Sequence, residues 1–280
     1  MYPCNLASNR KEEEKMSNRI ENRIQTLKER REKALVTYMT AGLPDMEGCK
    51  ALIKAQEEAG TDILELGIPF SDPVADGPVI QAASYKAIQQ GTNLKKVFAL
   101  MGEIRNEGVE IPIIFMMYYN TILHYGIKEF VRECVQCGVD GVIVPDLPLE
   151  EQKELRKALE IEKAPILIQL VSPVSTDRIP KILEGARGFV YCVSSMGVTG
   201  QSGNFHQEII NYLSNVKAVS KIPVMMGFGI CYASDVAPMK DIIDGAIVGS
   251  HFINLMEEHK YSIEAAKEYC QTFKRELNAL

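Results

Sequence analysis

One segment of the chain carries two carboxylates in a setting suited to proton transfer. Glu65 stands inside an apolar run, between Leu64 and Leu66, and Asp76 follows at the end of a short loop rich in proline. A carboxylate withdrawn from water has a raised pKa, which brings it into the range where it can donate and accept a proton near neutral pH. The two residues therefore indicate general acid–base chemistry.

Each carboxylate also has a purely structural interpretation. Glu65 could accept hydrogen bonds from neighbouring backbone groups or hydroxyls. Asp76 stands directly before Gly77-Pro78, a typical helix start, so its side chain could cap that helix or instead reach over the site as a second carboxylate. The residues alone leave both alternatives open.

The elements around these residues follow a regular alternation. Short apolar runs of strand type alternate with longer amphipathic stretches of helical type, which indicates parallel strands buried on both faces. Eight such units in this length predict a (β/α)8 TIM barrel. An open doubly wound sheet should carry G-x-G-x-x-G after its first strand, and the chain has none there. The predicted strands are 34–40, 63–67, 111–117, 141–144, 165–170, 188–193, 222–226 and 245–248.

The helical stretches between the strands follow from the 3.6-residue spacing of apolar side chains. An added helix over about 17–33, with Ile20, Ile24 and Leu27 on one side, precedes the barrel. Residues 1–15 are polar and are predicted to be a disordered extension, with 16–280 forming one barrel domain. The other predicted helices are 46–59, 78–90, 94–106, 127–136, 150–161, 176–183, 206–219, 234–239 and 261–277.

The active site of such a barrel lies at the carboxyl ends of its strands. Alternation along a strand turns Leu64 and Leu66 toward the helices and Glu65 into the barrel mouth. Other strand ends supply side chains that could line a pocket, but none supplies the lysine that a Schiff-base aldolase needs. The four His show no ligand spacing, so no metal site is expected. The lining candidates are Tyr38, Tyr118, Tyr119, Asn120, Asp146, Tyr191 and Ser194.

Glycines follow the last two predicted strands. Residues 227–230 end the seventh strand and Gly249-Ser250 follow the eighth, where barrels often bind phosphate. Glycine lets backbone N–H groups approach an anion closely, and a helix start adds a favourable dipole. Each glycine could instead only form a tight turn. A third glycine-rich stretch, 197–203, is long and polar enough to be a mobile lid.

Composition excludes several classes of protein. The net charge of −6 and the absence of Trp argue against nucleic-acid binding. No apolar run approaches the ~20 residues that cross a bilayer, and no signal peptide is visible. Seven scattered Cys indicate a reducing cytoplasm. Cys134-x2-Cys137 has a metal or redox spacing but lies in a helical pattern without a second pair, so packing is the preferred interpretation.

Residues 64–78, LELGIPFSDPVADGP, closely resemble the signature of the tryptophan synthase alpha chain family. Three further stretches agree with that family, and the similarity runs from about residue 17 to the end of the chain. They are Tyr38-Met39-Thr40-Ala41-Gly42, Gly197-Val198-Thr199-Gly200 and Gly227-Phe228-Gly229-Ile230. Ser194-Ser195-Met196 departs from the family pattern where some members carry Arg, which concerns lid closure.

The resemblance implies a carbon–carbon lyase that splits indole-3-glycerol phosphate into indole and glyceraldehyde 3-phosphate. Glu65 would be the acid and base that protonates indole C3, and Asp76 would hold the indole N–H and stabilise the positive charge that develops on the ring. Thr199 would reach Asp76 when the lid closes. The resemblance also implies that Tyr38, Tyr118 and Tyr191 line the pocket and that Gly200, Gly229, Gly249 and Ser250 hold phosphate.

The resemblance further implies a partner. Family members work with a beta chain that carries pyridoxal phosphate, in an alpha2-beta2 heterotetramer, and Asp72, Pro73 and Asn120 match the face that meets it. No cofactor is expected in this chain itself. Two alternatives stay open: a mainly regulatory subunit with low activity alone, and a stand-alone lyase that releases indole.

Overall fold

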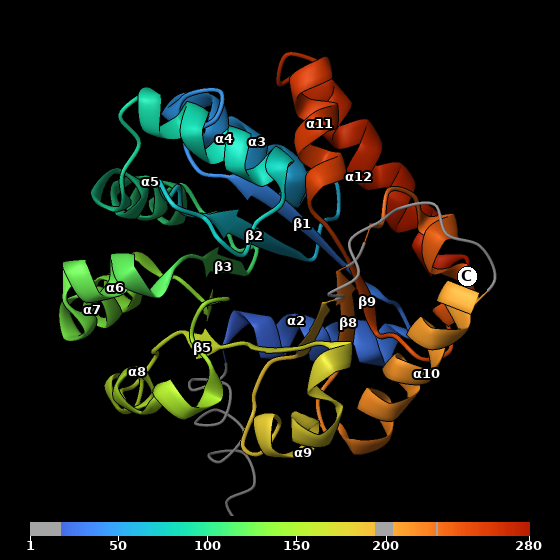
Figure 1. Ribbon diagram of the computed structural model, residues 1–280. Helices are drawn as coiled ribbons and strands as arrows, with labels where there is room; N and C mark the ends of the chain where they lie inside the picture. Colours follow the sequence, from blue (N-terminus) through green and yellow to red (C-terminus); the bar gives the residue numbers. More distant parts are fainter. Residues whose placement is uncertain (1–17, 194–203, 228) are drawn as a thin grey trace, which may run out of the picture.

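The computed structural model describes residues 18–193, 204–227 and 229–280, and its parallel strands form a ring surrounded by helices (Figure 1). The strand order is β5-β4-β3-β2-β1-β9-β8-β7-β6. The ring closes through residues 166–171, because β5 pairs with β4 and β6 pairs with β7. The strands are β1 (Ala34–Thr40), β2 (Ile63–Gly67), β3 (Ile113–Met116), β4 (Gly141–Ile143), β5 (Ile166–Leu167), β6 (Gln169–Val171), β7 (Val190–Val193), β8 (Val224–Gly227) and β9 (Gly245–Val248).

The predicted barrel is confirmed, with one local difference in its strands. The stretch predicted as one strand over 165–170 forms two short strands, β5 and β6, on either side of Ile168. This segment therefore pairs with β4 through its first part and with β7 through its second part. The predicted extension at 1–15 and the predicted lid at 197–203 lie outside the described residues.

Most predicted helices are present, with local differences. The stretch predicted as 150–161 forms a 3-10 turn at Leu149–Glu151 and an α-helix at Lys153–Ala158, and the stretch predicted as 234–239 forms a 3-10 turn at Ala233–Met239. The stretch predicted as 176–183 is divided, because the Pro180 ring cannot continue a helix from the preceding turn. The last helix begins at Ile263 rather than 261, where the Ser262 side chain accepts a hydrogen bond from the backbone of Ala265. Two helices, at Tyr119–Tyr125 and Ser250–Glu258, were not predicted. The helices are α3 (Met46–Glu58), α4 (Pro78–Gln89), α5 (Leu94–Asn106), α6 (Tyr119–Tyr125), α7 (Ile127–Cys137), α8 (Lys153–Ala158), α9 (Ile179–Ile182), α10 (Asn204–Val219), α11 (Ser250–Glu258) and α12 (Ile263–Asn278), with 3-10 turns η1 (Leu149–Glu151), η2 (Pro173–Arg178) and η3 (Ala233–Met239).

Alternation along the strands divides the core into two parts. Leu64 and Leu66 of β2 pack outward with the surrounding helices. Ile63 of the same strand packs inside the barrel with Val36 and Ile114. Glu65 has the same parity as Ile63, so it belongs to the barrel interior, as the sequence predicts. Within the described ranges, no helix combines the length and the apolar character needed to span a membrane.

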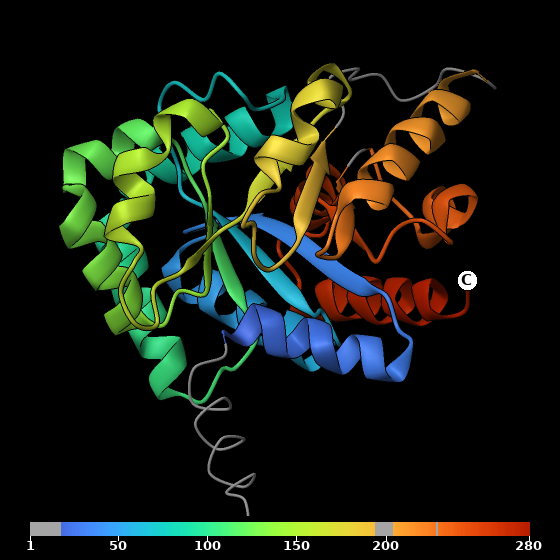
Figure 2. The same cartoon turned by 90° about the horizontal axis from the view of Figure 1, so that it is seen from below.

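The added N-terminal helix, α2 (Arg19–Arg30), closes the amino-terminal end of the barrel. Figure 2 shows it lying beneath the strands, and Figure 1 shows it across the centre of the ring. Its apolar side, with Ile20 and Leu27 buried and Ile24 packed beside them, joins the interior core. The strands finish at the opposite end of the barrel, away from this helix.

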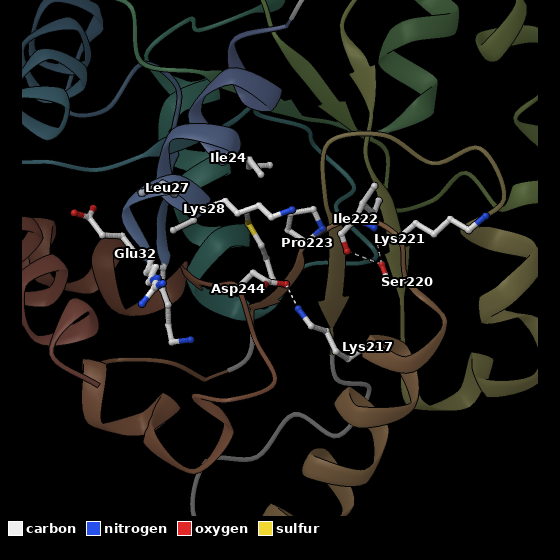
Figure 3. Close-up of a pocket in the computed structure, with 14 residues that line it drawn as sticks. Ile24, Leu27, Lys28, Glu32, Lys217, Ser220, Lys221, Ile222, Pro223 and Asp244 are labelled. Carbon is white, nitrogen blue, oxygen red and sulfur yellow. Dashed lines mark hydrogen bonds and ion pairs between the residues drawn. The ribbon is translucent and has the colours of Figure 1, made fainter.

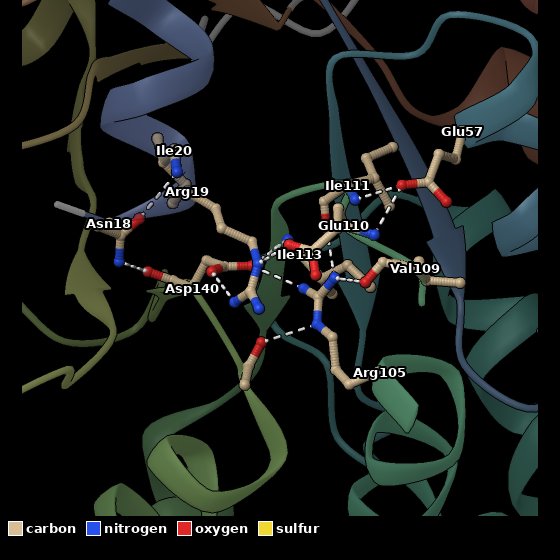
Figure 4. A network of polar contacts seen from close by, with 11 residues as sticks. Asn18, Arg19, Ile20, Glu57, Arg105, Val109, Glu110, Ile111, Ile113 and Asp140 are labelled. Carbon is tan, nitrogen blue, oxygen red and sulfur yellow. Dashed lines mark hydrogen bonds and ion pairs between the residues drawn. The ribbon is translucent and has the colours of Figure 1, made fainter. Parts of the chain in front are cut away.

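A buried polar network holds α2 in this position (Figure 4). The Asp140 carboxylate, 4% exposed, contacts Arg105 Nη2 at 2.8 Å and Arg19 Nη1 at 3.1 Å. It also accepts the backbone N–H of Ile113 at 2.9 Å, and the Asp140 carbonyl accepts a hydrogen bond from Asn18 at 2.7 Å. One carboxylate therefore ties together the helix, β3 and the start of β4.

Replacing Asp140 by Ala should destabilise the protein by about 3–5 kcal/mol, because it leaves the Arg105 guanidinium buried without its partner. Glu110→Ala is the matched control: Glu110 pairs with the same Arg19, but its side chain is 69% exposed. An exposed pair of this kind contributes about 0–1 kcal/mol. Urea unfolding of both variants measures the difference, and equal losses would contradict the assignment.

Candidate active site at the barrel mouth

Glu65 lies at the carboxyl end of β2 with its side chain inside the barrel. It stands level with Tyr38 of β1 and Ile114 of β3 in the sheet register. The residue is 1% exposed, and its Oε1 has no hydrogen-bond partner among the described residues. The described hydrogen bonds thus give no support to the interpretation of Glu65 as a structural residue tied to its neighbours. A buried, unsatisfied carboxylate is costly to keep and is typical of a functional site.

Asp76 is held by Tyr118 rather than by a helix. The Tyr118 hydroxyl donates a hydrogen bond to Asp76 Oδ2 at 2.9 Å and accepts one from the backbone N–H of Ala75, also at 2.9 Å. Gly77, not Asp76, is the residue that caps α4, and no side chain caps that helix start. The Phe70 ring stacks on the Tyr118 ring with centroids 5.0 Å apart. Tyr118 therefore fixes both the loop and the direction of the Asp76 carboxylate.

Burial perturbs both carboxylates in the same direction. It raises the pKa of Glu65 to about 8, and repulsion from Asp76 adds to that rise. Burial also raises the pKa of Asp76, while the hydrogen bond from Tyr118 acts in the opposite direction. Glu65 can therefore carry a proton at neutral pH and release it at little cost, while a hydrogen bond stabilises the charged form of Asp76.

Glu65→Gln should make the folded protein more stable, by an amount that grows with pH. Folding raises the pKa of Glu65. Between about pH 4.5 and pH 8 its side chain is therefore ionised in the unfolded chain and protonated in the folded protein. The wild type therefore loses stability across that window, and the loss levels off above pH 8. The Gln variant lacks this loss. Its free energy of unfolding should therefore exceed that of the wild type by several kcal/mol at pH 8, because each pKa unit corresponds to about 1.4 kcal/mol. Urea unfolding at pH 5 and pH 8 checks this, and a difference independent of pH would contradict the raised pKa.

Two tyrosines complete the walls around the carboxylates. Burial raises the pKa of Tyr38 and Tyr191, and the charges of both Glu65 and Asp76 contribute to each rise. All four groups therefore lie close enough to interact.

Two glycines make room for these rings. A Cβ added at Gly67 would lie 2.0 Å from the Tyr38 hydroxyl oxygen, and one at Gly227 would lie 2.3 Å from Tyr191 Cε2. This role was not predicted for either residue. The available signal was a glycine at the inward-facing end of a strand, where a barrel normally places a bulky side chain.

The glycines proposed for phosphate lie at the carboxyl ends of β8 and β9. Gly229 has a left-handed backbone with φ +56°, which favours glycine. Gly249 is the N-cap residue of α11. Ser250 therefore begins the helix, and its backbone N–H points out of the helix start. A Cβ added at Gly249 would lie 3.9 Å from Tyr38 Cβ, which places this strand end beside the tyrosine wall. Thr199 and Gly200 lie outside the described residues.

The residues predicted to face a partner lie at the rim of the same end. Asp72 is exposed and Pro73 half-buried in the loop that ends at Asp76, and Asn120 is exposed in α6, just after Tyr118. Val74, in the same loop, is 84% exposed. Among the described residues, no group of three or more His, Cys, Asp or Glu side chains gathers where it could hold a metal ion.

Fold and site together define a class of protein: a (β/α)8 barrel with two perturbed carboxylates at its mouth, an arrangement for acid–base chemistry on a small molecule. Comparison with known proteins shows which family within this class the chain belongs to. The family model of the tryptophan synthase alpha chain matches residues 24–280. The chain therefore belongs to the tryptophan synthase alpha chain family, the family of the subunit that cleaves indole-3-glycerol phosphate in tryptophan biosynthesis.

Individual relatives agree along nearly the whole chain. The tryptophan synthase alpha chain of Lachnospira eligens is 62% identical, covering 94% of this chain and 100% of that protein. The one from Alkaliphilus metalliredigens is 44% identical, covering 91% and 97%. Among solved structures, tryptophan synthase subunit alpha from Legionella pneumophila is 33% identical with a TM-score of 0.86, covering 94% of this chain and 100% of that chain. The resemblance seen in the signature, and the fold it implies, are confirmed.

Proposed function

We propose that this chain performs a retro-aldol cleavage of indole-3-glycerol phosphate in which Glu65 moves the protons and Asp76 stabilises charge. Glu65 delivers a proton to indole C3 and accepts the proton of the glycerol hydroxyl as the carbon–carbon bond breaks. Asp76 accepts the indole N–H and balances the positive charge on the ring. The family supports the substrate, and the assignment of these two residues rests on the site itself.

The buried Glu65 carboxylate is the observation that carries this proposal. It lies at the barrel mouth, without a hydrogen-bond partner in the described part of the chain and with a pKa of about 8. A group of this kind can act as acid in one step and as base in another at neutral pH. Asp76 lies at the same end of the barrel and already accepts a hydrogen bond from Tyr118, so its free oxygen lone pairs can receive an N–H donor.

Indole release from indole-3-glycerol phosphate by the purified chain tests the function, with and without an added tryptophan synthase beta chain. We expect indole in both cases and a higher rate with the beta chain. Full activity without any response to the beta chain would favour a stand-alone lyase. Indole formation that appears only with the beta chain would favour a regulatory subunit, and none in either case would refute the proposal.

We also propose the phosphate site and the partner-binding face. Gly229, Gly249 and Ser250, with Gly200 from outside the described residues, hold the phosphate through backbone N–H groups and the start of α11. Asp72, Pro73 and Asn120 belong to the face for a beta chain, and the exposed Val74 beside them supplies apolar area for that contact. Pyridoxal phosphate belongs to that partner, and the assembly is an alpha2-beta2 complex in the cytoplasm.

Gly229→Val should weaken binding of glycerol 3-phosphate steeply while leaving the binding of free indole nearly unchanged. A β-branched side chain disfavours the left-handed backbone at this position, and it also fills the space through which the anion approaches the amides. Indole binds at the carboxylate end of the pocket and does not need this turn. Both dissociation constants are measured on the same variant by calorimetry, and an unchanged affinity for glycerol 3-phosphate would move the phosphate site elsewhere.

A further inference from the structure

A cavity lies at the amino-terminal end of the barrel (Figure 3). Glu65 lies toward the opposite end, where the strands finish. It has a volume of about 420 Å³, within the usual range for small-molecule sites. Its walls come from the second half of α2, the start of β1, the end of α10 with the loop into β8, and the residue before β9. Neither carboxylate of the proposed active site contributes to it.

The floor of this cavity is the interior core of the barrel. Leu27, Ala34 and Met225 are buried core residues that reach the cavity from α2, β1 and β8. Ile24 and Pro223 add half-buried apolar surface beside them. A ligand with an apolar body could therefore bury that body against side chains that are already ordered.

The rim of the cavity carries a surplus of positive charge. Five cationic residues line it against two acidic ones, in a chain whose net charge is −6. The cationic residues are Lys28, Arg31, Lys33, Lys217 and Lys221, and the acidic ones are Glu32 and Asp244.

Both acidic residues already have partners. Asp244 pairs with Lys217 at 2.5 Å and accepts the backbone N–H of Val224, and Glu32 lies 3.5 Å from Lys274. Lys33 is also engaged, because its ammonium donates to the carbonyls of Ile243 and Lys240. Asp244, Lys217, Glu32 and Lys33 thus already have partners within the protein.

Three cations remain for a ligand. Within the described ranges, Lys28, Arg31 and Lys221 form no ion pair and no side-chain hydrogen bond. Lys28, in the last turn of α2, and Arg31, just after it, also suit the negative end of the helix dipole, which explains their presence there. That explanation does not cover Lys221, which comes from the loop after α10. In Figure 3, Lys28 extends from α2 across the cavity toward Pro223.

We propose that this cavity is a binding site for a small aromatic anion, such as a carboxylate or sulfonate, separate from the site at the barrel mouth. The aromatic body packs on Leu27, Pro223 and Met225. The anionic group faces Lys28, Arg31 and Lys221, whose charges no protein carboxylate in the described structure neutralises. This pairing of an apolar floor with an uncompensated basic rim selects against neutral aromatic compounds and against small inorganic anions.

Titration with 1-anilinonaphthalene-8-sulfonate tests the proposal, because this aromatic anion becomes fluorescent when its rings leave water. We expect saturable binding that weakens by about tenfold in the double variant Lys28→Gln, Lys221→Gln. The matched control Lys95→Gln, Lys128→Gln changes the net charge equally, at exposed positions elsewhere, and should bind as the wild type does. The uncharged N-phenyl-1-naphthylamine should bind the wild type and both double variants with the same weak affinity. 1-Naphthoate should displace the sulfonate probe, whereas 1-naphthol should not.

Competition separates this cavity from the proposed active site. Indole with glycerol 3-phosphate should leave the sulfonate probe bound. Displacement by these two compounds, or equal affinity in the wild type and the Lys28, Lys221 variant, would overturn the proposal. Circular dichroism confirms that each variant is folded, and Lys221→Gln alone, which leaves α2 unchanged, provides the test if the double variant is not. Indole release by these variants should equal that of the wild type, so this result is independent of the proposed function.

Discussion

Glu65→Gln should lower the rate of indole formation by roughly 10²–10⁴-fold, the range that general acid–base catalysis contributes. Gln keeps the size of the side chain and its place in β2, but it has no proton to exchange. The wild-type carboxyl group, with its pKa of about 8, can be present in either form at neutral pH. Steady-state assays with indole-3-glycerol phosphate, alone and with a beta chain, measure the loss.

Two controls show whether the loss is chemical. Glu110→Gln changes an exposed carboxylate at the other end of the barrel and should leave the rate unchanged. The Glu65→Gln variant should also bind glycerol 3-phosphate as the wild type does, and by the linkage argument it should be at least as stable. A variant that turns over at nearly the wild-type rate would show that another group transfers the proton.

Asp76→Asn should lower kcat by about 10²–10³-fold, equivalent to roughly 3–4 kcal/mol of barrier, with a modest change in KM. Asn can still accept a hydrogen bond, but it has no charge to balance the positive indole ring as the bond breaks. Because that charge is largest in the transition state, the loss belongs in kcat. A change confined to KM would make Asp76 a binding residue only.

Tyr118→Phe provides a graded comparison for this second prediction. It keeps the Asp76 charge but removes the hydroxyl that contacts both Asp76 Oδ2 and the Ala75 backbone. Its loss in kcat should therefore be smaller than that of Asp76→Asn. Because the Tyr118 hydrogen bond lowers the pKa of Asp76, the acidic limb of the pH–rate profile should also move to higher pH in the Phe variant. A profile that does not move would show that Tyr118 only lines the pocket.

Much of the site could be predicted because it depends on local rules. A strand has a period of two, so a carboxylate between two leucines that face the helices must face the barrel interior. The same regularity, repeated as strand and helix along the chain, indicates a closed barrel and hence a site at the strand ends. The signature around Glu65 and Asp76 then indicated the family, which the comparisons confirm.

Contacts between distant parts of the chain could not be read in this way. The sequence left Asp76 as either a helix cap or a free carboxylate, and a hydrogen bond from Tyr118, 42 residues away, decided it. Gly67 and Gly227 leave space for tyrosines of neighbouring strands, and these contacts also join residues that are far apart in the sequence.

The cavity beneath the barrel also depends on tertiary structure, since its cations come from α2 and the residues that follow it, from α10, and from the loop before β8. Local sequence determines the conformation of each element and the face that it buries, because those depend on neighbours along the chain. Which side chains from separate elements meet depends on how the barrel closes and on how α2 covers its end, and only the tertiary structure determines that.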